Sequence, residues 1–187
     1  MNVVALYGSP RRDGNSDSML DVFLAERNSD DTLIKIIPSE LNFSHCRGCR
    51  LCEKTGVCAI NDEMNGVAET LLQADRVIIG APIFFYSFPA SLKALIDRSQ
   101  ALWSRKYLLK EEMKLKKGFL LAVGATKGQK LFEGVILTIR FFFDGFGCEY
   151  QGELVFRGFD KKGDILNCLE CIKEIQQAAH IFLAKDE

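Results

Sequence analysis

The chain has 187 residues, of which 48% are hydrophobic and 26% are charged, so it is long enough to build one domain with a substantial core, which argues against a disordered chain. Its net charge of −1 lacks the basic surplus that neutralises nucleic acid phosphates, which argues against nucleic acid as a partner. No apolar stretch reaches the roughly 20 residues that cross a membrane, and residues 1–6 lack the features of a signal peptide, so we expect a cytoplasmic protein.

Predicted strands and helices alternate along the chain. A continuous apolar run predicts a buried strand at 3–7, and further strands are predicted at 32–37, 76–81, 118–124 and 147–156. Apolar residues at helical spacing predict five helices. The first begins at a cap on Asn15 or Ser16, and the others span 67–74, about 88 through 102, 131–143 and 163–184. This alternation predicts an α/β fold with a parallel sheet. Five strands fit the doubly wound, flavodoxin-like order 2-1-3-4-5, with residues 1–187 as a single domain.

A polar, glycine-containing segment, GSPRRDGNS, joins the first strand to the first helix. The free N–H groups at a helix start bind phosphate, and Gly14 lets the backbone turn there. The segment is neither GxGxxG nor a Walker loop, because Asp13 stands where the second glycine would be. It favours a mononucleotide such as FMN, although an ordinary turn with a polar cap is the alternative. The side chains that could contact a phosphate are hydroxyl, amide and guanidinium groups: Ser9, Arg11, Arg12, Asn15 and Ser16.

An aromatic segment, PIFFYSFPA, follows the third strand, which Pro82 ends at the carboxyl edge of the predicted sheet. Ligands of such sheets bind outside the carboxyl ends of the strands. The aromatic rings of Phe84 and Phe85 and the backbone groups beside them could therefore contact a flavin. The alternative is that these aromatic residues belong to the core.

Four of the seven cysteines lie in an insertion at about 41–63, with the pattern C-x2-C-x2-C-x5-C. Thiolates at this spacing in an irregular loop can converge on one [4Fe–4S] cluster. Zinc uses similar spacings, and free or redox-active thiols are a third possibility. The candidate metal ligands are Cys46, Cys49, Cys52 and Cys58.

The phosphate segment and the aromatic segment together resemble the NAD(P)H-dependent FMN reductase and iron–sulfur flavoprotein group, and the cysteine motif resembles that of the iron–sulfur flavoproteins. The resemblance implies FMN, with NAD(P)H as a transient reductant and a small-molecule or protein redox partner. Phe84 stands where the family usually has a tyrosine, and the run after Gly124 departs from the small residues usual there. The residues implied to surround the flavin ring are Pro82, Ile83, Phe84, Phe85, Gly124, Ala125, Thr126 and Gly128.

We therefore expect an FMN-dependent oxidoreductase, with or without a [4Fe–4S] cluster. The alternative is a non-enzymatic flavodoxin-like protein that holds a structural zinc in its cysteine loop. Trp103 and Phe141–Phe143 are more apolar than the surface of a lone domain needs, so we expect an oligomer interface, and the family resemblance implies a homodimer or homotetramer. Cys168 and Cys171, three apart on the predicted last helix, are expected to be core thiols rather than a redox pair, and Cys148 a core residue.

Overall fold

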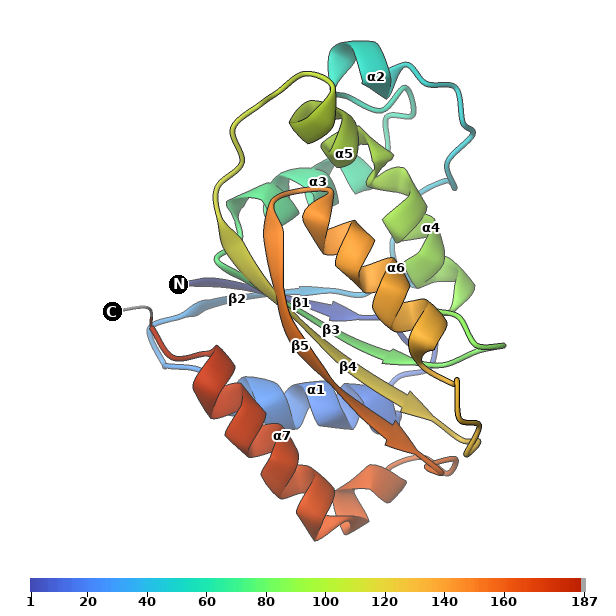
Figure 1. Cartoon of the computed structure of the whole chain (residues 1–187), viewed down its shortest axis with the longest axis vertical. Coiled ribbons are helices and arrows are strands. Elements are labelled where there is room, and N and C mark those ends of the chain that lie inside the picture. Colours follow the sequence, from blue (N-terminus) through green and yellow to red (C-terminus); the bar gives the residue numbers. More distant parts are fainter. Residues whose placement is uncertain (186–187) are drawn as a thin grey trace.

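A computed structural model of the chain describes residues 1–185, and five parallel strands form the sheet at its centre. They lie in the order β2-β1-β3-β4-β5 (Figure 1). This order confirms the predicted flavodoxin-like fold class. The strands are β1 (Asn2–Tyr7), β2 (Thr32–Ile36), β3 (Arg76–Pro82), β4 (Lys116–Gly124) and β5 (Cys148–Arg157).

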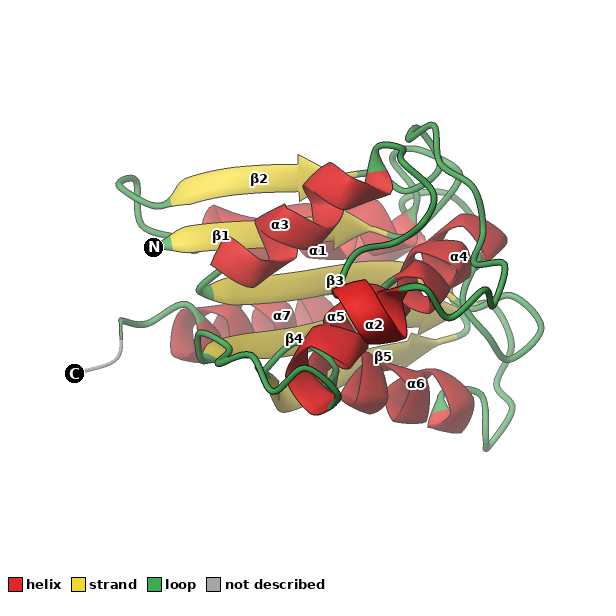
Figure 2. Ribbon diagram, turned by 90° about the horizontal axis from the view of Figure 1, so that it is seen from above, coloured by secondary structure: helices red, strands yellow, loops and turns green. Residues whose placement is uncertain are grey.

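Helices cover both faces of the sheet, because parallel strands need crossover connections (Figures 1 and 2). One face carries α1 (Asn15–Ala25) and α7 (Leu169–Phe182), which pack against each other. The short helix α2 (Cys52–Thr55) lies in the cysteine-rich insertion and packs on α5. The other face carries α3 (Met64–Gln73), α4 (Ala90–Arg98), α5 (Gln100–Tyr107) and α6 (Glu133–Asp144).

Alternate side chains of the central strands enter two separate apolar cores. Val3 and Ala5 of β1 pack with α1 and α7, whereas Val4 and Leu6 pack with the helices of the opposite face. All four are fully buried. A strand covered on both faces needs apolar residues at every position, which is why these strands appear in the sequence as uninterrupted apolar runs.

The loops that follow β1, β3 and β4 meet at one edge of the sheet. Tyr7 pairs with Gly80 in the β1–β3 register, and the amide of Gly8 donates to the carbonyl of Gly80 at 2.7 Å. Beyond β3, the amide of Ile83 donates to the carbonyl of Val123 in β4 at 2.9 Å. The parallel register therefore brings together the phosphate segment, the aromatic segment and the loop after Gly124.

Three helix predictions are wrong in detail. The predicted helix from about 88 through 102 is two helices, α4 and α5, which meet at Ser99. Gly14 is the N-cap of α1, so Asn15 and Ser16 lie inside the first turn and do not cap it. The predicted last helix, 163–184, is two helices, a 3₁₀ helix η1 (Asp164–Asn167) and then α7. The chain turns to an extended conformation at Cys168 between them, with φ −95° and ψ 90°. Apolar spacing continues through this break, so the pattern alone could not reveal it.

The core-thiol prediction for the last helix is also wrong. Cys168 and Cys171 form a disulfide, whereas the other five cysteines of residues 1–185 are free. Their Cα atoms are 5.3 Å apart, a separation at which cysteines pair. The prediction for Cys148 is confirmed, since it is buried at the start of β5.

Only part of the expected apolar surface is exposed. Phe142 and Phe143 are buried in the core, which corrects the prediction for this run, while Phe141 is 70% exposed and Leu137, one turn earlier, is 58% exposed. Helical periodicity explains the difference, since neighbouring residues point to different sides of α6. Within residues 1–185, no helix combines the length and apolarity needed to cross a membrane.

Candidate cofactor site and cysteine loop

The phosphate segment is held tightly against the sheet at Gly8. A Cβ atom there would lie 2.5 Å from Leu92 Cδ2 and 2.9 Å from Ala81 Cβ, so only glycine fits. Gly14 meets no such restriction, because its φ is −80° and its surroundings are open. The loop thus depends on glycine for close packing at its start, not for an unusual backbone conformation at its end.

Ser16 stands out in the first turn of α1. Its side chain is 1% exposed, and its Oγ has no hydrogen-bond partner among the described residues. A buried hydroxyl without a partner is costly and rare in folded proteins. The first backbone N–H groups of a helix also lack partners within it, and they carry partial positive charge. Together these donors make a site suited to an anion such as a phosphate.

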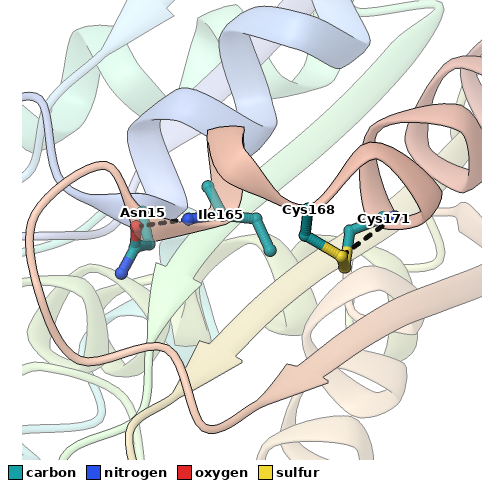
Figure 3. Close-up of a disulfide and its surroundings, with 4 residues drawn as sticks. All are labelled: Asn15, Ile165, Cys168 and Cys171. Carbon is teal, nitrogen blue, oxygen red and sulfur yellow. Dashed lines mark hydrogen bonds between the residues drawn. A yellow bond between two sulfur atoms is a disulfide. The ribbon is translucent and has the colours of Figure 1, made fainter.

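Two other predicted phosphate donors are engaged within the protein. Ser9 Oγ donates to the carbonyl of Arg11 at 2.8 Å and accepts from its amide at 3.0 Å. Asn15 Nδ2 donates to the carbonyl of Lys161 at 2.9 Å, and its Oδ1 accepts from the amide of Ile165 at 3.1 Å (Figure 3). Asn15 therefore ties the 161–165 segment to α1, and one of the two N–H groups of its amide is used in doing so.

The two arginines of the loop differ in their surroundings. Arg12 forms an ion pair with Asp17 at 3.3 Å, donates to the carbonyl of Ser9 and lies over the ring of Tyr7. Arg11 is exposed and lines the cavity beside Ser16. Arg11 is thus the guanidinium that is available to an anion, whereas the contacts of Arg12 with other residues of the protein stabilise the loop.

A cavity of about 80 Å³ lies where the three loops meet. Nine of the fourteen predicted cofactor residues line it, while Arg12, Phe85, Gly124, Thr126 and Gly128 do not. Val123, Phe159 and Asp160 were missed by the sequence analysis. The last two follow β5 at the same sheet edge, which is the signal that could have found them. The nine are Ser9, Arg11, Gly14, Asn15, Ser16, Pro82, Ile83, Phe84 and Ala125.

The aromatic segment forms a tight turn beside the cavity. Phe84 and Ser87 exchange two backbone hydrogen bonds of 2.9 Å, and Phe85 and Tyr86 between them have φ of 49° and 61°. Positive φ is strained for aromatic residues and is common at functional sites. Phe85 is fully exposed at the tip, whereas Tyr86 Oη packs so closely on Gly128 that a Cβ there would lie 2.5 Å away.

The four loop cysteines line a second cavity, of about 510 Å³. The amide of Gly48 donates to Cys46 Sγ at 3.4 Å, and the amide of Ile60 donates to Cys58 Sγ at 3.5 Å. Such N–H groups stabilise sulfur that carries negative charge. Within residues 1–185, no three cysteine, histidine or acidic side chains stand close enough together to hold a metal ion in this conformation.

Arg98 of α4 fastens both ends of the cysteine loop, a role that the sequence analysis missed. Its guanidinium donates to the carbonyls of Ser44 at 2.7 Å and Ile60 at 3.2 Å. It also makes a two-pronged ion pair with Asp62, with both N–O distances 2.8 Å. The side chain of Arg98 is completely buried. Asp62 also accepts from the amide of Met64, the first residue of α3, at 3.2 Å.

The hydrogen bonds from Arg98 lower the pKa of Asp62 below its usual range. A lowered pKa in the folded state stabilises the protein above the unfolded value of about 3.9, and this stabilisation is lost as the pH falls through the lowered pKa. We expect Asp62→Asn to reduce the free energy of unfolding most at neutral pH and progressively less below about pH 4. Urea unfolding of both proteins at stepped pH measures this. A difference that stays constant down to acid pH would contradict it.

Comparison with known proteins agrees with this architecture. The family model for NADPH-dependent FMN reductase matches residues 1–133. An iron–sulfur flavoprotein of Methanocaldococcus jannaschii is 34% identical over 130 residues, which cover 68% of this chain and 64% of that protein. One of Methanosarcina thermophila is 32% identical over 130 residues, covering 68% of this chain and 65% of that protein. The matches thus span less than two thirds of these relatives.

Solved structures show the same fold at low sequence identity. An NAD(P)H:quinone oxidoreductase from Methanothermobacter marburgensis superposes with a TM-score of 0.74 at 18% identity, covering 100% of this chain and 98% of that chain. An azoreductase from Bacillus anthracis gives a TM-score of 0.72 at 18% identity, covering 97% and 100%. These two likenesses establish the fold alone, but the family model covers most of the chain and includes both the phosphate loop and the cysteine loop. The chain belongs to the NADPH-dependent FMN reductase family.

Proposed function

We propose that the protein is an FMN-dependent oxidoreductase that is reduced by NAD(P)H and passes electrons to a small-molecule or protein acceptor. The observation that carries the proposal is the unpartnered Ser16 Oγ, buried at the start of α1. Family membership supports the same cofactor. The Ser16 hydroxyl, the first N–H groups of α1 and Arg11 together supply the donors that a phosphate monoester needs.

The other residues of the site would orient the cofactor. The enclosed cavity, about 80 Å³, is small beside the roughly 300–1,000 Å³ of typical ligand pockets, so it suits the phosphate end of FMN. Pro82, Ile83 and Phe84 offer an apolar face next to it, and Phe84 is 48% exposed. Bound FMN supplies the redox chemistry, and the protein binds and orients it.

A flavin titration tests the proposal directly. Adding FMN to the purified protein is expected to quench flavin fluorescence to a one-to-one end point, and NAD(P)H added without oxygen is expected to bleach the bound flavin. Comparing NADH with NADPH then identifies the donor. A protein that binds no flavin even at excess FMN would overturn the proposal.

We further propose that Cys46, Cys49, Cys52 and Cys58 hold a [4Fe–4S] cluster. They line one cavity, two of them accept backbone N–H bonds, and two relatives are named iron–sulfur flavoproteins. A cavity of about 510 Å³ is also roomier than a single zinc ion needs. The loop thiols would have to converge on binding, and the chain between them turns through two residues with positive φ, Gly48 at 64° and Arg50 at 63°.

Metal analysis of protein purified without oxygen distinguishes the alternatives. We expect about four iron and four sulfide per chain, together with broad visible absorption beneath the flavin bands. One zinc per chain without iron would favour the structural zinc site, and no metal at all would leave free or redox-active thiols. Either of these results would overturn the cluster proposal and would leave the FMN proposal unchanged.

We also propose that the protein forms a homodimer or homotetramer through α6. Leu137 and Phe141 are exposed on this helix, and Trp103 and Phe141 line a groove between α5 and α6. Light scattering is expected to give a mass at least twice the 21.0 kDa of one chain. A monomer at all concentrations would rule out the assembly.

A further inference from the structure

A disulfide between Cys168 and Cys171 lies at the first turn of α7, outside both sites described above (Figure 3). Cys168 is the N-cap of the helix, and its Sγ accepts a hydrogen bond from the amide of Cys171 at 3.3 Å. The sulfur therefore takes the position that a serine or aspartate oxygen takes at an ordinary helix start.

A structural role explains this disulfide poorly. It joins residues only three apart in sequence, and a cross-link restricts the unfolded chain more when the loop that it closes is longer. The helix is already held by apolar packing, since Ile175 and Ala179 are fully buried and Phe182 nearly so, in the core shared with α1. The bond thus contributes little that α7 needs in order to stay in place.

The surroundings of the pair suit thiol–disulfide exchange. A helix N-terminus stabilises a thiolate, and α7 has 14 residues with Cys168 directly at its start. The two cysteine residues differ in exposure, because Cys168 is partly exposed while Cys171 is 8% exposed. Leu166 and Leu169, close to Cys168 in the chain, are 49% and 75% exposed, and Cys168 itself lies at the edge of the core shared by α1 and α7.

We propose that Cys168 and Cys171 are a redox-active pair that exchanges two electrons with a dithiol reductant. One thiolate of the reductant attacks Cys168 Sγ, the S–S bond breaks, and Cys171 leaves as the thiol. The second thiolate of the reductant then attacks the reductant sulfur that is bound to Cys168 in the mixed disulfide. This releases Cys168 as a thiolate, which the helix start stabilises. The reductant ends as a disulfide and the protein carries the two electrons as reduced cysteines, with one thiol proton of the reductant on Cys171 and the other released to solvent while Cys168 is a thiolate.

Redox titration of the full-length protein tests the pair. The protein is equilibrated in stepped ratios of reduced to oxidised dithiothreitol, and in parallel of glutathione, then alkylated in acid. The tryptic peptide 163–173 contains both cysteines and no others, so mass spectrometry reports this pair separately from the loop thiols. We expect reduction and reoxidation to follow the same curve while circular dichroism stays unchanged. A disulfide that is reduced only after the protein is unfolded, or thiols that never pair under oxidising buffer, would overturn the proposal.

Single variants identify the attacked sulfur. With Cys171→Ser the remaining Cys168 is expected to react with iodoacetamide about tenfold faster than Cys171 does in Cys168→Ser, because its thiolate is stabilised and accessible. The reverse order would refute the assignment to Cys168. The control is Cys148→Ser, which removes a buried free thiol and should leave the titration of peptide 163–173 unchanged.

Discussion

Replacing Ser16 with alanine is expected to weaken FMN binding by about 10- to 150-fold, since hydrogen bonds to a charged group contribute about 1.5–3 kcal/mol. The same change is expected to leave the protein without FMN equally stable or more stable. The reason is that the hydroxyl is buried without a partner in this structure, and such a group costs stability. A loss of affinity combined with a gain of stability is typical of a group kept for function.

Ser18→Ala is the matched control, because Ser18 lies in the same helix but does not line the cavity. Fluorescence titration gives the dissociation constant of FMN, and urea unfolding gives the stability of each protein without FMN. We expect Ser18→Ala to change the dissociation constant less than about twofold. Equal affinities for Ser16→Ala and the starting protein would show that the hydroxyl does not face the phosphate.

The meeting of the three predicted cofactor loops at one edge of the sheet could be predicted because it follows from strand order. Apolar runs locate the strands, a parallel sheet puts their carboxyl ends on one edge, and the polar and aromatic segments follow β1 and β3 directly. The structure accordingly brings Ser16, Phe84 and Ala125 to one cavity. This part of the prediction needed no knowledge of any long-range side-chain contact.

The roles of individual polar residues could not be predicted in this way. Asn15 looked like a phosphate donor, but its partners, Lys161 and Ile165, lie some 150 positions further along the chain. Arg12 and Arg11 are adjacent in sequence and equally charged, yet one pairs with Asp17 and the other faces the cavity. The partners of Asn15 come from a distant segment, which a local pattern does not contain, and the different surroundings of Arg11 and Arg12 depend on how the loop folds.

The role of Arg98 was not predicted at all, for a similar reason. In the sequence it is one more charged residue near the end of an amphipathic helix, 36 positions from Asp62. Folding buries it completely between α4 and the cysteine loop. The only signal in the sequence is indirect. Asp62 follows the last loop cysteine by four residues, and an aspartate in that place needs a positively charged partner if it is to hold the loop.

Arg98→Met is expected to cost about 3–5 kcal/mol of unfolding free energy, because removing one member of a buried ion pair leaves the other charge uncompensated. Four acceptor contacts are lost together, from the carbonyls of Ser44 and Ile60 and from both oxygens of Asp62. Arg98→Lys keeps the charge but lacks the planar fork, so it should recover only part of the loss. Urea unfolding measures all three proteins.

Arg105→Met is the control for this change. Arg105 lies one helix further on and also contacts two carboxylates, Glu111 at 2.6 Å and Glu69 at 3.0 Å, but on the protein surface. Surface ion pairs contribute at most about 1 kcal/mol, so this variant should stay close to the starting protein. If the cysteine loop holds a cluster, Arg98→Met should also lose iron, because both ends of the loop are released, whereas Arg105→Met should retain it. Equal losses of unfolding free energy for Arg98→Met and Arg105→Met would contradict the role of buried Arg98 in holding the cysteine loop.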